Sequence, residues 1–406
     1  ACRPGPSRKE SSDAGGNNLD RSSHQGQHVS MSEGQPGSTL PNPEHGANME
    51  NGGNGYRPRL GDRLFSRKTL AVSVVAIAVL AVTAFRVLDI DRDEMWDQVK
   101  GVDPVTYLFA GVLYYISFWF RGIRWRLIVR ASGLNENPNV VQIGNAKYSA
   151  IILMGWFANS VAFFRLGDAY RAYALGRETG ISMASSLGTL LGERAQDILI
   201  VLGLLVVGAA GLLVTGEVTL PVYVLAAAAG VSGATLLALM VMRTYGERLA
   251  RHLPDRLEEI YHPLRAGALG SFKVRQLPVQ FTLGIIGWGL EIGRVYFVAE
   301  SLGLDIGFFV IMSAALTIAV LSTIPTPGGF GFVEGGLTGV LIFLGLGDTQ
   351  ALTLTIVDRS ISWISIIVIG GTLFLTWQTL TARRGRSGNG RPETPDGVAP
   401  TVADSE

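Results

Sequence analysis

Cysteine, histidine and charged residues are scarce in this chain of 406 residues. The sequence has one cysteine, Cys2, which excludes both an intrachain disulfide and a cysteine metal cluster. The histidines lie in polar stretches, at His24, His28, His45, His252 and His262. We therefore expect no metal site in an apolar segment, and nothing in the composition calls for a cofactor.

The charges that are present are distributed unevenly. Asp, Glu, Lys and Arg make up 17% of the sequence, against roughly 25% in an ordinary soluble domain. The formal net charge is +1, which gives no reason to expect binding to nucleic acid. Hydrophobic residues make up 48%, and the charges crowd into the two ends and a few connections. Long uncharged runs of this kind are typical of a polytopic membrane protein.

Six apolar runs approach the length of about 20 residues that a membrane-spanning helix needs. Five are uncharged throughout: Thr69–Phe85, Pro104–Phe120, Ile198–Gly216, Thr219–Met242 and Ser360–Ala382. The sixth, Gln276–Ala299, contains Glu291 and Arg294, which we interpret as an ion pair on one helix face. The predicted fold class is therefore all-α, a polytopic membrane helix bundle.

The same distribution predicts three segments. Residues 1–64 are rich in Gly, Asn, Ser, Pro and Gln. They are predicted to be a disordered tail, because such a stretch buries too little apolar surface to offset the entropy of ordering. Residues 65–380 are predicted to form the membrane domain, and residues 381–406 a second disordered tail.

Basic residues predict the orientation, because loops rich in Lys and Arg stay in the cytoplasm. They cluster before the first span, after the second, in the connection 243–275 and after the last, whereas residues 89–103 are mainly acidic. We expect a multi-pass protein of a bacterial plasma membrane with both termini in the cytoplasm. In this interpretation Arg121 and Arg124 are cytoplasmic. Four tryptophans are interpreted as interface anchors: Trp119, Trp125, Trp363 and Trp377.

Two further stretches, 139–197 and 306–359, are apolar but interrupted. The first is broken by the charged segment from Arg165 to Arg171. The second is broken ahead of Glu334 by Pro325, Pro327, Gly328, Gly329 and Gly331. Irregular backbone at membrane depth occurs only where protein buries it or where it lines a wet cavity. We therefore predict two interrupted helical hairpins beside a site, and about eight helices in all.

The two interrupted stretches share an order of charged residues. Arg194 follows Asp168 by 26 residues, and Arg359 follows Glu334 by 25. In the predicted orientation the hairpins enter from opposite sides. This is the pattern of inverted repeats, whose interrupted segments meet at a midplane site. Chance is the alternative, because few side chains are identical between the two halves.

The charged residues around the breaks are the candidate site. A charge near the bilayer centre costs about 2.5–3.5 kcal/mol, so these side chains are expected to avoid lipid tails. A guanidinium group holds phosphate oxygens in two bonds and stays charged. The predicted headgroup-binding residues are Arg194, Arg359, Glu334, Asp168, Glu193, Asp358, Arg165 and Arg171. The alternatives are internal salt bridges, side chains that snorkel to the interface and, for Arg165 and Arg171, ordinary cytoplasmic charges.

Enzyme motifs are absent from the sequence. It contains no P-loop, no Gly-x-Ser-x-Gly and no His-Glu-x-x-His. We therefore predict no catalytic residues, and ATP-driven transport by this chain alone is disfavoured.

The charged elements resemble a known family, the lysylphosphatidylglycerol synthase transmembrane family. The resemblance covers residues 65–380, and Asp168 stands where a Glu is more usual. The elements that carry it are Gly-Asp168-x-x-Arg171, Glu193-Arg194-x-x-Asp197, Pro325-x-Pro-Gly-Gly-x-Gly-x-x-Glu334 and Asp358-Arg359.

This resemblance implies a flippase-like bundle that moves a phospholipid or a polyprenyl-linked lipid between leaflets. In bifunctional members of the family a separate soluble domain performs aminoacyl transfer, and neither predicted tail suits such a domain. The expected partners are then membrane lipids and a separate lipid-modifying enzyme or glycosyltransferase. Two alternatives stay open: a membrane-embedded transferase with Glu334 or Asp168 as its base, and an ion-coupled carrier of small solutes.

Overall fold

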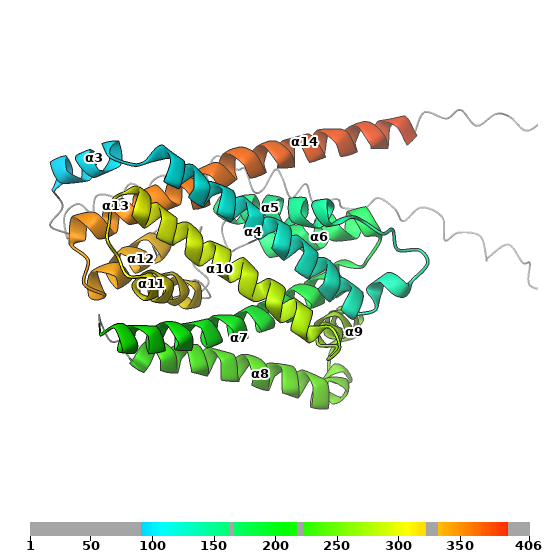
Figure 1. Ribbon diagram of the computed structural model, residues 1–406. Coiled ribbons are helices and arrows are strands. Elements are labelled where there is room, and N and C mark those ends of the chain that lie inside the picture. Colours follow the sequence, from blue (N-terminus) through cyan, green and yellow to red (C-terminus); the bar gives the residue numbers. More distant parts are fainter. Residues whose placement is uncertain (1–90, 162–165, 217–221, 322–331, 389–406) are drawn as a thin grey trace, which may run out of the picture. The chain divides into compact units, whose positions relative to one another are not determined.

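The computed structural model describes four ranges of the chain: 91–161, 166–216, 222–321 and 332–388. The chain divides into two compact units, Ala1–Pro58 and Arg59–Glu406. The first unit lies wholly outside the described residues, as do the rest of the predicted tail and the predicted span Thr69–Phe85. In the described ranges every regular element is a helix, which confirms the all-α prediction (Figure 1).

The helices follow one another through short connections. In chain order they are α3 (Arg92–Lys100), α4 (Pro104–Ala131), the 3-10 turn η2 (Leu134–Glu136), α5 (Asn145–Val161), α6 (Gly167–Thr179), α7 (Met183–Thr215), α8 (Val222–Ala250), α9 (Asp255–Gly270), α10 (Leu277–Ser301), α11 (Phe308–Leu321), α12 (Phe332–Phe343), α13 (Asp348–Arg359), the π-helix η5 (Ser360–Ile364) and α14 (Ser365–Gly388). The last three form one continuous helix. It passes the predicted end of the membrane domain at residue 380, and residues 389–406 lie outside the described ranges.

Within the described ranges, four helices are long and apolar enough to cross a membrane. They are Met183–Thr215, Val222–Ala250, Leu277–Ser301 and Asp348–Leu380. These helices correspond to four of the six predicted spans. A fifth predicted span, Pro104–Phe120, lies in α4, which has 28 residues. This helix is not among the four, because its Tyr, Trp and Arg residues lower its hydropathy.

The long helices α4 and α10 pack antiparallel along each other (Figure 1). At one end the N–H of Asp103 donates to the carbonyl of Ser301 at 2.8 Å, and towards the other end Gly284 faces Arg124. Asp103 also caps α4. Its carboxylate accepts from the hydroxyl of Thr106 at 2.5 Å and from the N–H of Thr106 at 2.9 Å. These bonds lower the pKa of the Asp103 carboxyl below its ordinary value.

Small residues allow α7 and α9 to approach closely. A Cβ atom on Gly188 would lie 2.1 Å from the carbonyl oxygen of Leu264, and one on Gly192 would lie 2.5 Å from Ser271 Cβ. From the other side, a Cβ atom on Gly267 would lie 2.4 Å from the carbonyl oxygen of Ser185. Glycines four residues apart bring helix backbones together in this way. The connection 243–275 therefore contains the end of α8 and the helix α9, and α9 packs against α7.

Two pairs of short helices occupy the predicted hairpins, α5 with α6 and α11 with α12. The intervals between them, 162–165 and 322–331, lie outside the described residues. The predicted site residue Arg165 and the helix-breaking residues Pro325, Pro327, Gly328, Gly329 and Gly331 therefore lie outside them too. Of the predicted break from Arg165 to Arg171, residues 167–171 form the first turns of α6.

The start of α6 is fixed against α5. The N–H of Gly167 donates to Asn159 Oδ1 at 2.7 Å, and a Cβ atom on Gly167 would lie 2.1 Å from the carbonyl oxygen of Gly155. Only glycine permits this backbone approach, because any side chain would collide with α5. The contact sets the position of Asp168, the next residue.

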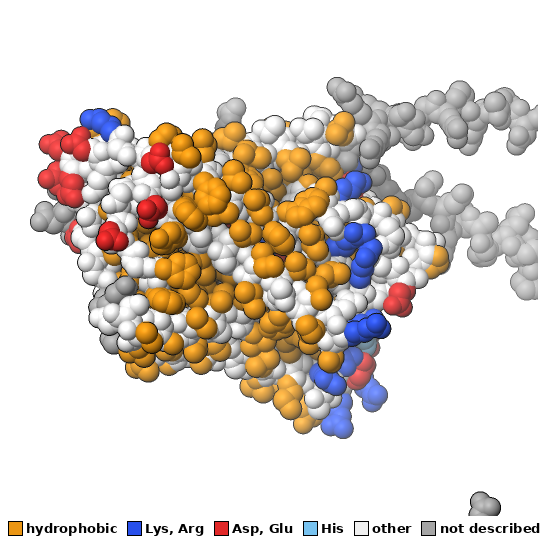
Figure 2. All heavy atoms as spheres, in the orientation of Figure 1, with side chains coloured by type: hydrophobic (Ala, Val, Ile, Leu, Met, Phe, Trp, Pro, Cys, Tyr) orange, Lys and Arg blue, Asp and Glu red, His pale blue; other side chains and the backbone are white. Residues whose placement is uncertain are grey.

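Charged side chains on the face shown in Figure 2 gather at two ends. Asp and Glu lie at the end formed by α3, and Lys and Arg lie at the end formed by α9. Hydrophobic side chains cover the band between them. This surface is expected for helices that cross the hydrocarbon of a bilayer.

Candidate functional site

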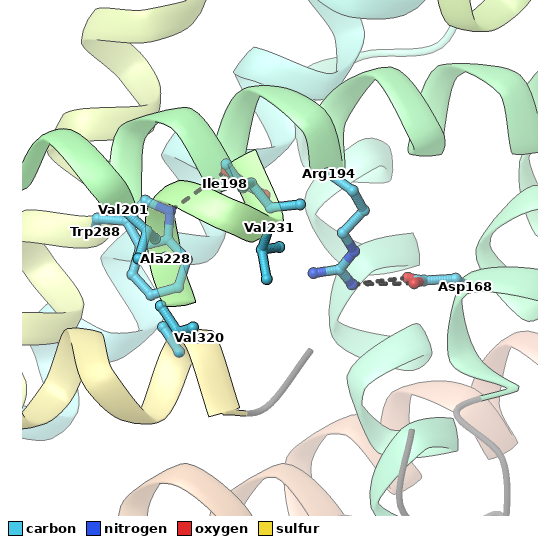
Figure 3. A pocket seen from close by; sticks show the side chains of 10 residues that line it. Asp168, Arg194, Ile198, Val201, Ala228, Val231, Trp288 and Val320 are labelled. Carbon is cyan, nitrogen blue, oxygen red and sulfur yellow. Dashed lines mark hydrogen bonds and ion pairs between the residues drawn. The ribbon is translucent and has the colours of Figure 1, made fainter. Parts of the chain in front are cut away.

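A cavity of about 330 Å³ lies between α6, α7, α8, α10 and α11 (Figure 3). Its charged lining is formed by Asp168 of α6 and by Arg194 and Asp197 of α7, and Trp288 of α10 lies on the other side, beside Val201, Ala228 and Val320 (Figure 3). The remaining lining is apolar and consists of Ile198, Val201, Ala228, Val231, Ala319 and Val320. A charged end beside an apolar wall suits an amphipathic ligand.

Arg194 and Asp168 form the ion pair that faces this cavity (Figure 3). Arg194 Nη2 lies 3.1 Å from both carboxylate oxygens of Asp168. Their side chains are 46% and 33% exposed, because they line an open cavity. Among the described residues Arg194 donates hydrogen bonds to Asp168 alone. A guanidinium has five N–H groups, so donors remain for a ligand.

Arg171 and Glu193 form a buried pair next to the first one. Arg171 Nη2 donates to Glu193 Oε2 at 2.7 Å, and Arg171 Nη1 lies 3.6 Å from Asp168 Oδ1. The guanidinium carbon of Arg171 also lies 4.4 Å from the ring centre of Trp125, a cation–π contact. Arg171 is not among the residues that line the cavity. It supports Asp168 from within the protein.

Asp197 connects the cavity to the interior of the bundle. It pairs with the buried Arg124 of α4, and it accepts from the indole N–H of Trp288 at 3.4 Å. Arg124 Nη2 also donates to Gln196 Oε1 at 3.3 Å, and Gln196 Nε2 donates to Gln280 Oε1 at 2.8 Å. Polar contacts therefore join α4, α7 and α10. These contacts offset the free-energy cost of removing the buried charges from water.

A second group of ion pairs lies between α4, α10 and α13. Arg294 pairs with Asp358 and, at 3.4 Å, with Glu291. Glu291 also accepts from Arg121 Nη2 at 3.3 Å. The guanidinium carbon of Arg294 lies 5.2 Å from the ring centre of Tyr114. None of the four charged side chains is more than 12% exposed, so each depends on its partner for neutralisation.

Arg359, the residue after Asp358, forms a further ion pair with Glu334. Arg359 Nε lies 3.3 Å from Glu334 Oε1, which belongs to the first turn of α12, and both side chains are less than a quarter exposed. The helix then continues as the π-helix η5, where the hydroxyls of Ser360 and Tyr107 are 2.5 Å apart. Single-turn π-helices occur often at functional sites.

These contacts make up a charge-balanced set that we call the ion-pair network. It contains six arginines and six carboxylates: Arg121, Arg124, Arg171, Arg194, Arg294 and Arg359, with Asp168, Glu193, Asp197, Glu291, Glu334 and Asp358. Within the network, Asp168 and Arg194 are the most exposed members.

The predicted site residues fall into two groups. The first, beside the cavity, is Asp168, Arg171, Glu193 and Arg194; the second is Glu334, Asp358 and Arg359. Among the described residues no hydrogen bond or ion pair joins the two groups directly. The predicted pair of Glu291 and Arg294 is present, and it forms part of the larger network.

The interpretation of Arg121 and Arg124 as charges that follow the end of the second span is wrong. Helix α4 continues from Pro104 to Ala131, and both arginines lie within it and pair with carboxylates of α10 and α7. Their spacing of three residues and the aromatic residues around them are signals of a buried helix face. Asp197 was present in the sequence pattern but was not predicted as a site residue.

The interpretation of Trp125 as an interface anchor is also wrong. Its side chain is fully buried, its ring packs against Arg171, and its indole N–H donates to the hydroxyl of Thr189 at 3.3 Å. A buried tryptophan needs such a partner for its N–H. Trp125 therefore helps to position the pair of Arg171 and Glu193.

The helices and the ion-pair network define a polytopic helical membrane protein with charged residues in its interior. The sequence pattern of one family, the lysylphosphatidylglycerol synthase TM region, matches residues 69–370. The chain belongs to this family, as its charged elements predicted.

Several relatives of the chain come from archaea. The chain is 26% identical over 324 residues to a UPF0104 membrane protein of Methanothermobacter thermautotrophicus, covering 73% of this chain and 92% of that protein. It is 29% identical over 223 residues to a UPF0104 membrane protein of Methanocaldococcus jannaschii, covering 54% and 93%. These relatives give no support to the prediction of a bacterial source.

A third relative is larger. The chain is 25% identical over 356 residues to the glycosyltransferase AglD of Haloferax volcanii, covering 78% of this chain and 54% of AglD. This chain therefore spans about half the length of that relative.

Proposed function

We propose that this protein moves a lipid with an anionic headgroup between the leaflets of its membrane. The observation that carries the proposal is the pair of Arg194 and Asp168, which faces a cavity inside a bundle of membrane helices. A charged pair that is exposed at such a place is costly, and charged residues inside membrane segments mark substrate pathways. Arg194 offers a planar set of donors that fits phosphate oxygens.

The size of the cavity supports a headgroup as its occupant. A volume of about 330 Å³ lies at the lower end of the range for small-molecule pockets. A phosphate and its polar substituent fit this space, whereas two acyl chains do not. The chains would remain in the hydrocarbon beside the apolar wall formed by residues such as Val201, Ala228 and Val320.

The relatives support lipid-linked sugars as one class of substrate. One of them is named a glycosyltransferase, and this chain matches about half of its length. The match covers most of this chain, which is a membrane protein, so we propose that the matching region binds the lipid-linked substrate of a sugar transfer. A separate glycosyltransferase or lipid-modifying enzyme would then supply or consume the lipid that this chain moves.

An inverted repeat would supply the movement. In each half a carboxylate in the first turn of a short helix pairs with an arginine of the following helix, Asp168 with Arg194 and Glu334 with Arg359. In each half an arginine of a central helix also pairs with an acidic residue, Arg124 with Asp197 and Arg294 with Asp358. The central helices α4 and α10 are antiparallel, as inverted halves require.

The distribution of surface charge supports an orientation. We propose that the end formed by α9, where Lys and Arg gather in Figure 2, faces the cytoplasm. The acidic end formed by α3 would then face the outside of a plasma membrane.

Exchange of fluorescent lipid in reconstituted vesicles tests the proposal. Dithionite bleaches fluorophores in the outer leaflet, so the extent and rate of bleaching report movement between leaflets. Fluorescent phosphatidylglycerol and a fluorescent polyprenyl-phosphate sugar are tested in parallel. We expect Arg194→Ala to slow exchange at least roughly tenfold, which corresponds to the loss of a charge-assisted contact worth about 1.4 kcal/mol or more.

Arg248→Ala is the matched control, because Arg248 is exposed on α8 and its guanidinium lies 6.0 Å from the ring of Tyr245. It should exchange lipid at the wild-type rate. The proposal fails if wild type exchanges neither lipid faster than protein-free vesicles, or if Arg194→Ala and Arg248→Ala exchange it equally fast.

A further inference from the structure

The charge balance around the cavity determines what else must bind there. Asp168 and Glu193 face Arg171 and Arg194 through contacts of 3.1, 2.7 and 3.6 Å. Among the described residues, these four side chains carry two positive and two negative charges. The neighbouring pair of Asp197 and Arg124 is neutral as a unit.

We propose that the cavity takes up one proton together with each anionic headgroup, and that the proton is carried by the carboxyl of Asp168. This inference rests on the proposed function, and it names a second substrate for the same site. A phosphodiester that binds Arg194 adds one negative charge to a group that is already neutral. Two anionic groups that share one site repel each other, and this repulsion favours the binding of a proton by one of them.

Asp168 is the carboxylate best placed to receive this proton. Its side chain is 33% exposed and lines the cavity. It pairs with the guanidinium group of Arg194, to which the phosphate would also bind. Glu193 is buried against Arg171 at 2.7 Å and does not line the cavity. Asp197 lines the cavity, but it is already paired with Arg124 and accepts from the indole N–H of Trp288.

Among the described residues, the other groups around Asp168 do not supply a competing proton site. Helix α7 presents Arg194, Glu193 and Asp197, and α6 itself presents Arg171. Helix α5 presents the amide of Asn159, which already accepts from the N–H of Gly167. The described parts of α8, α10 and α11 at the cavity contribute Ala228, Val231, Trp288, Ala319 and Val320, none of which titrates.

Coupled binding has a defined signature. When the headgroup leaves, Asp168 returns to Arg194 and releases its proton, so a lipid and a proton move together. Apparent affinity for an anionic lipid should fall as pH rises, by up to about tenfold per pH unit, if one proton is bound with each lipid.

Calorimetric titration with dihexanoyl phosphatidylglycerol, a soluble phosphodiester lipid, measures this signature on the full-length protein in detergent. Titrations at one pH in buffers of different ionisation enthalpy give the number of protons bound with the lipid. We expect about one proton for wild type at neutral pH. We expect Asp168→Asn, whose amide resembles the protonated carboxyl, to bind the lipid without proton uptake and with an affinity independent of pH.

Asp97→Asn is the matched control, because Asp97 is exposed on α3 and contacts Lys100 there. It should keep the wild-type proton count. Binding of the lipid by wild type with no proton uptake overturns this inference and leaves lipid transport intact. Absence of binding under all conditions overturns the proposed function as well. The proton count of wild type decides the matter even if Asp168→Asn does not fold.

Discussion

Replacing Arg294 tests whether the ion-pair network stabilises the bundle. In Arg294→Met an apolar side chain of similar length replaces the arginine. The side chain of Asp358 is 2% exposed. Of its described side-chain contacts it would then keep the hydrogen bond from the hydroxyl of Ser362, at 3.3 Å. Glu291 would keep Arg121 at 3.3 Å. Removing one partner of a buried pair costs about 3–5 kcal/mol, because the other charge stays buried without compensation.

The double variant Arg294→Met, Asp358→Leu separates this cost from simple loss of packing. It removes both charges of the pair and leaves Glu291 paired with Arg121. Replacing a whole buried pair by apolar residues of similar volume is often neutral. We therefore expect the double variant to be within about 1–2 kcal/mol of wild type, and more stable than Arg294→Met.

Equilibrium unfolding in mixed micelles of dodecyl maltoside and dodecyl sulfate, followed by circular dichroism, measures these free energies. Refolding on dilution of the sulfate detergent establishes reversibility. The reasoning is refuted if Arg294→Met loses less than about 1 kcal/mol, or if the double variant loses the sum of the two single variants.

Two further predictions concern the helix packing and a cap. Gly188→Leu should destabilise the protein by about 2 kcal/mol or more in the same assay, because its Cβ atom would lie 2.1 Å from the backbone oxygen of Leu264. Gly203→Leu on the same helix should cost little, since no atom lies within 4 Å of its added Cβ, and equal losses would contradict the packing. Thr106→Val should raise the pKa of Asp103 towards 3.8, measured by NMR titration, because it removes the hydroxyl donor. A lowered carboxyl pKa stabilises the fold above the unfolded-state pKa, and that contribution is lost as pH falls through the folded-state value. An unchanged pKa would show that the hydroxyl of Thr106 does not stabilise the charged form of Asp103.

The apolar runs predicted the spanning helices well, because hydrocarbon imposes a composition that can be read locally. The run Ile198–Gly216 lies within α7 except for its last residue, and Gln276–Ala299 lies within α10 except for its first. These features depend only on neighbours along the chain.

The interior charges were predicted less well, because their compensation comes from distant residues. Arg124 lies 73 residues from Asp197, and Arg121 lies 170 residues from Glu291. A charge at the end of an apolar run resembles the end of a span unless its partner is known. The sequence alone therefore favoured a short second span, whereas α4 continues to Ala131.

The pair of Asp168 and Arg194 was predictable for a geometric reason. Eleven residues separate Asp168 from the end of α6 at Thr179, and eleven separate the start of α7 at Met183 from Arg194. Both arms are roughly 16 Å long at about 1.5 Å per residue, so antiparallel packing brings the two side chains level. Charge spacing in a sequence therefore predicts an ion pair when a short turn joins two helical arms of equal length. It cannot predict the pairs of α4, because no single turn relates α4 to α7 or α10.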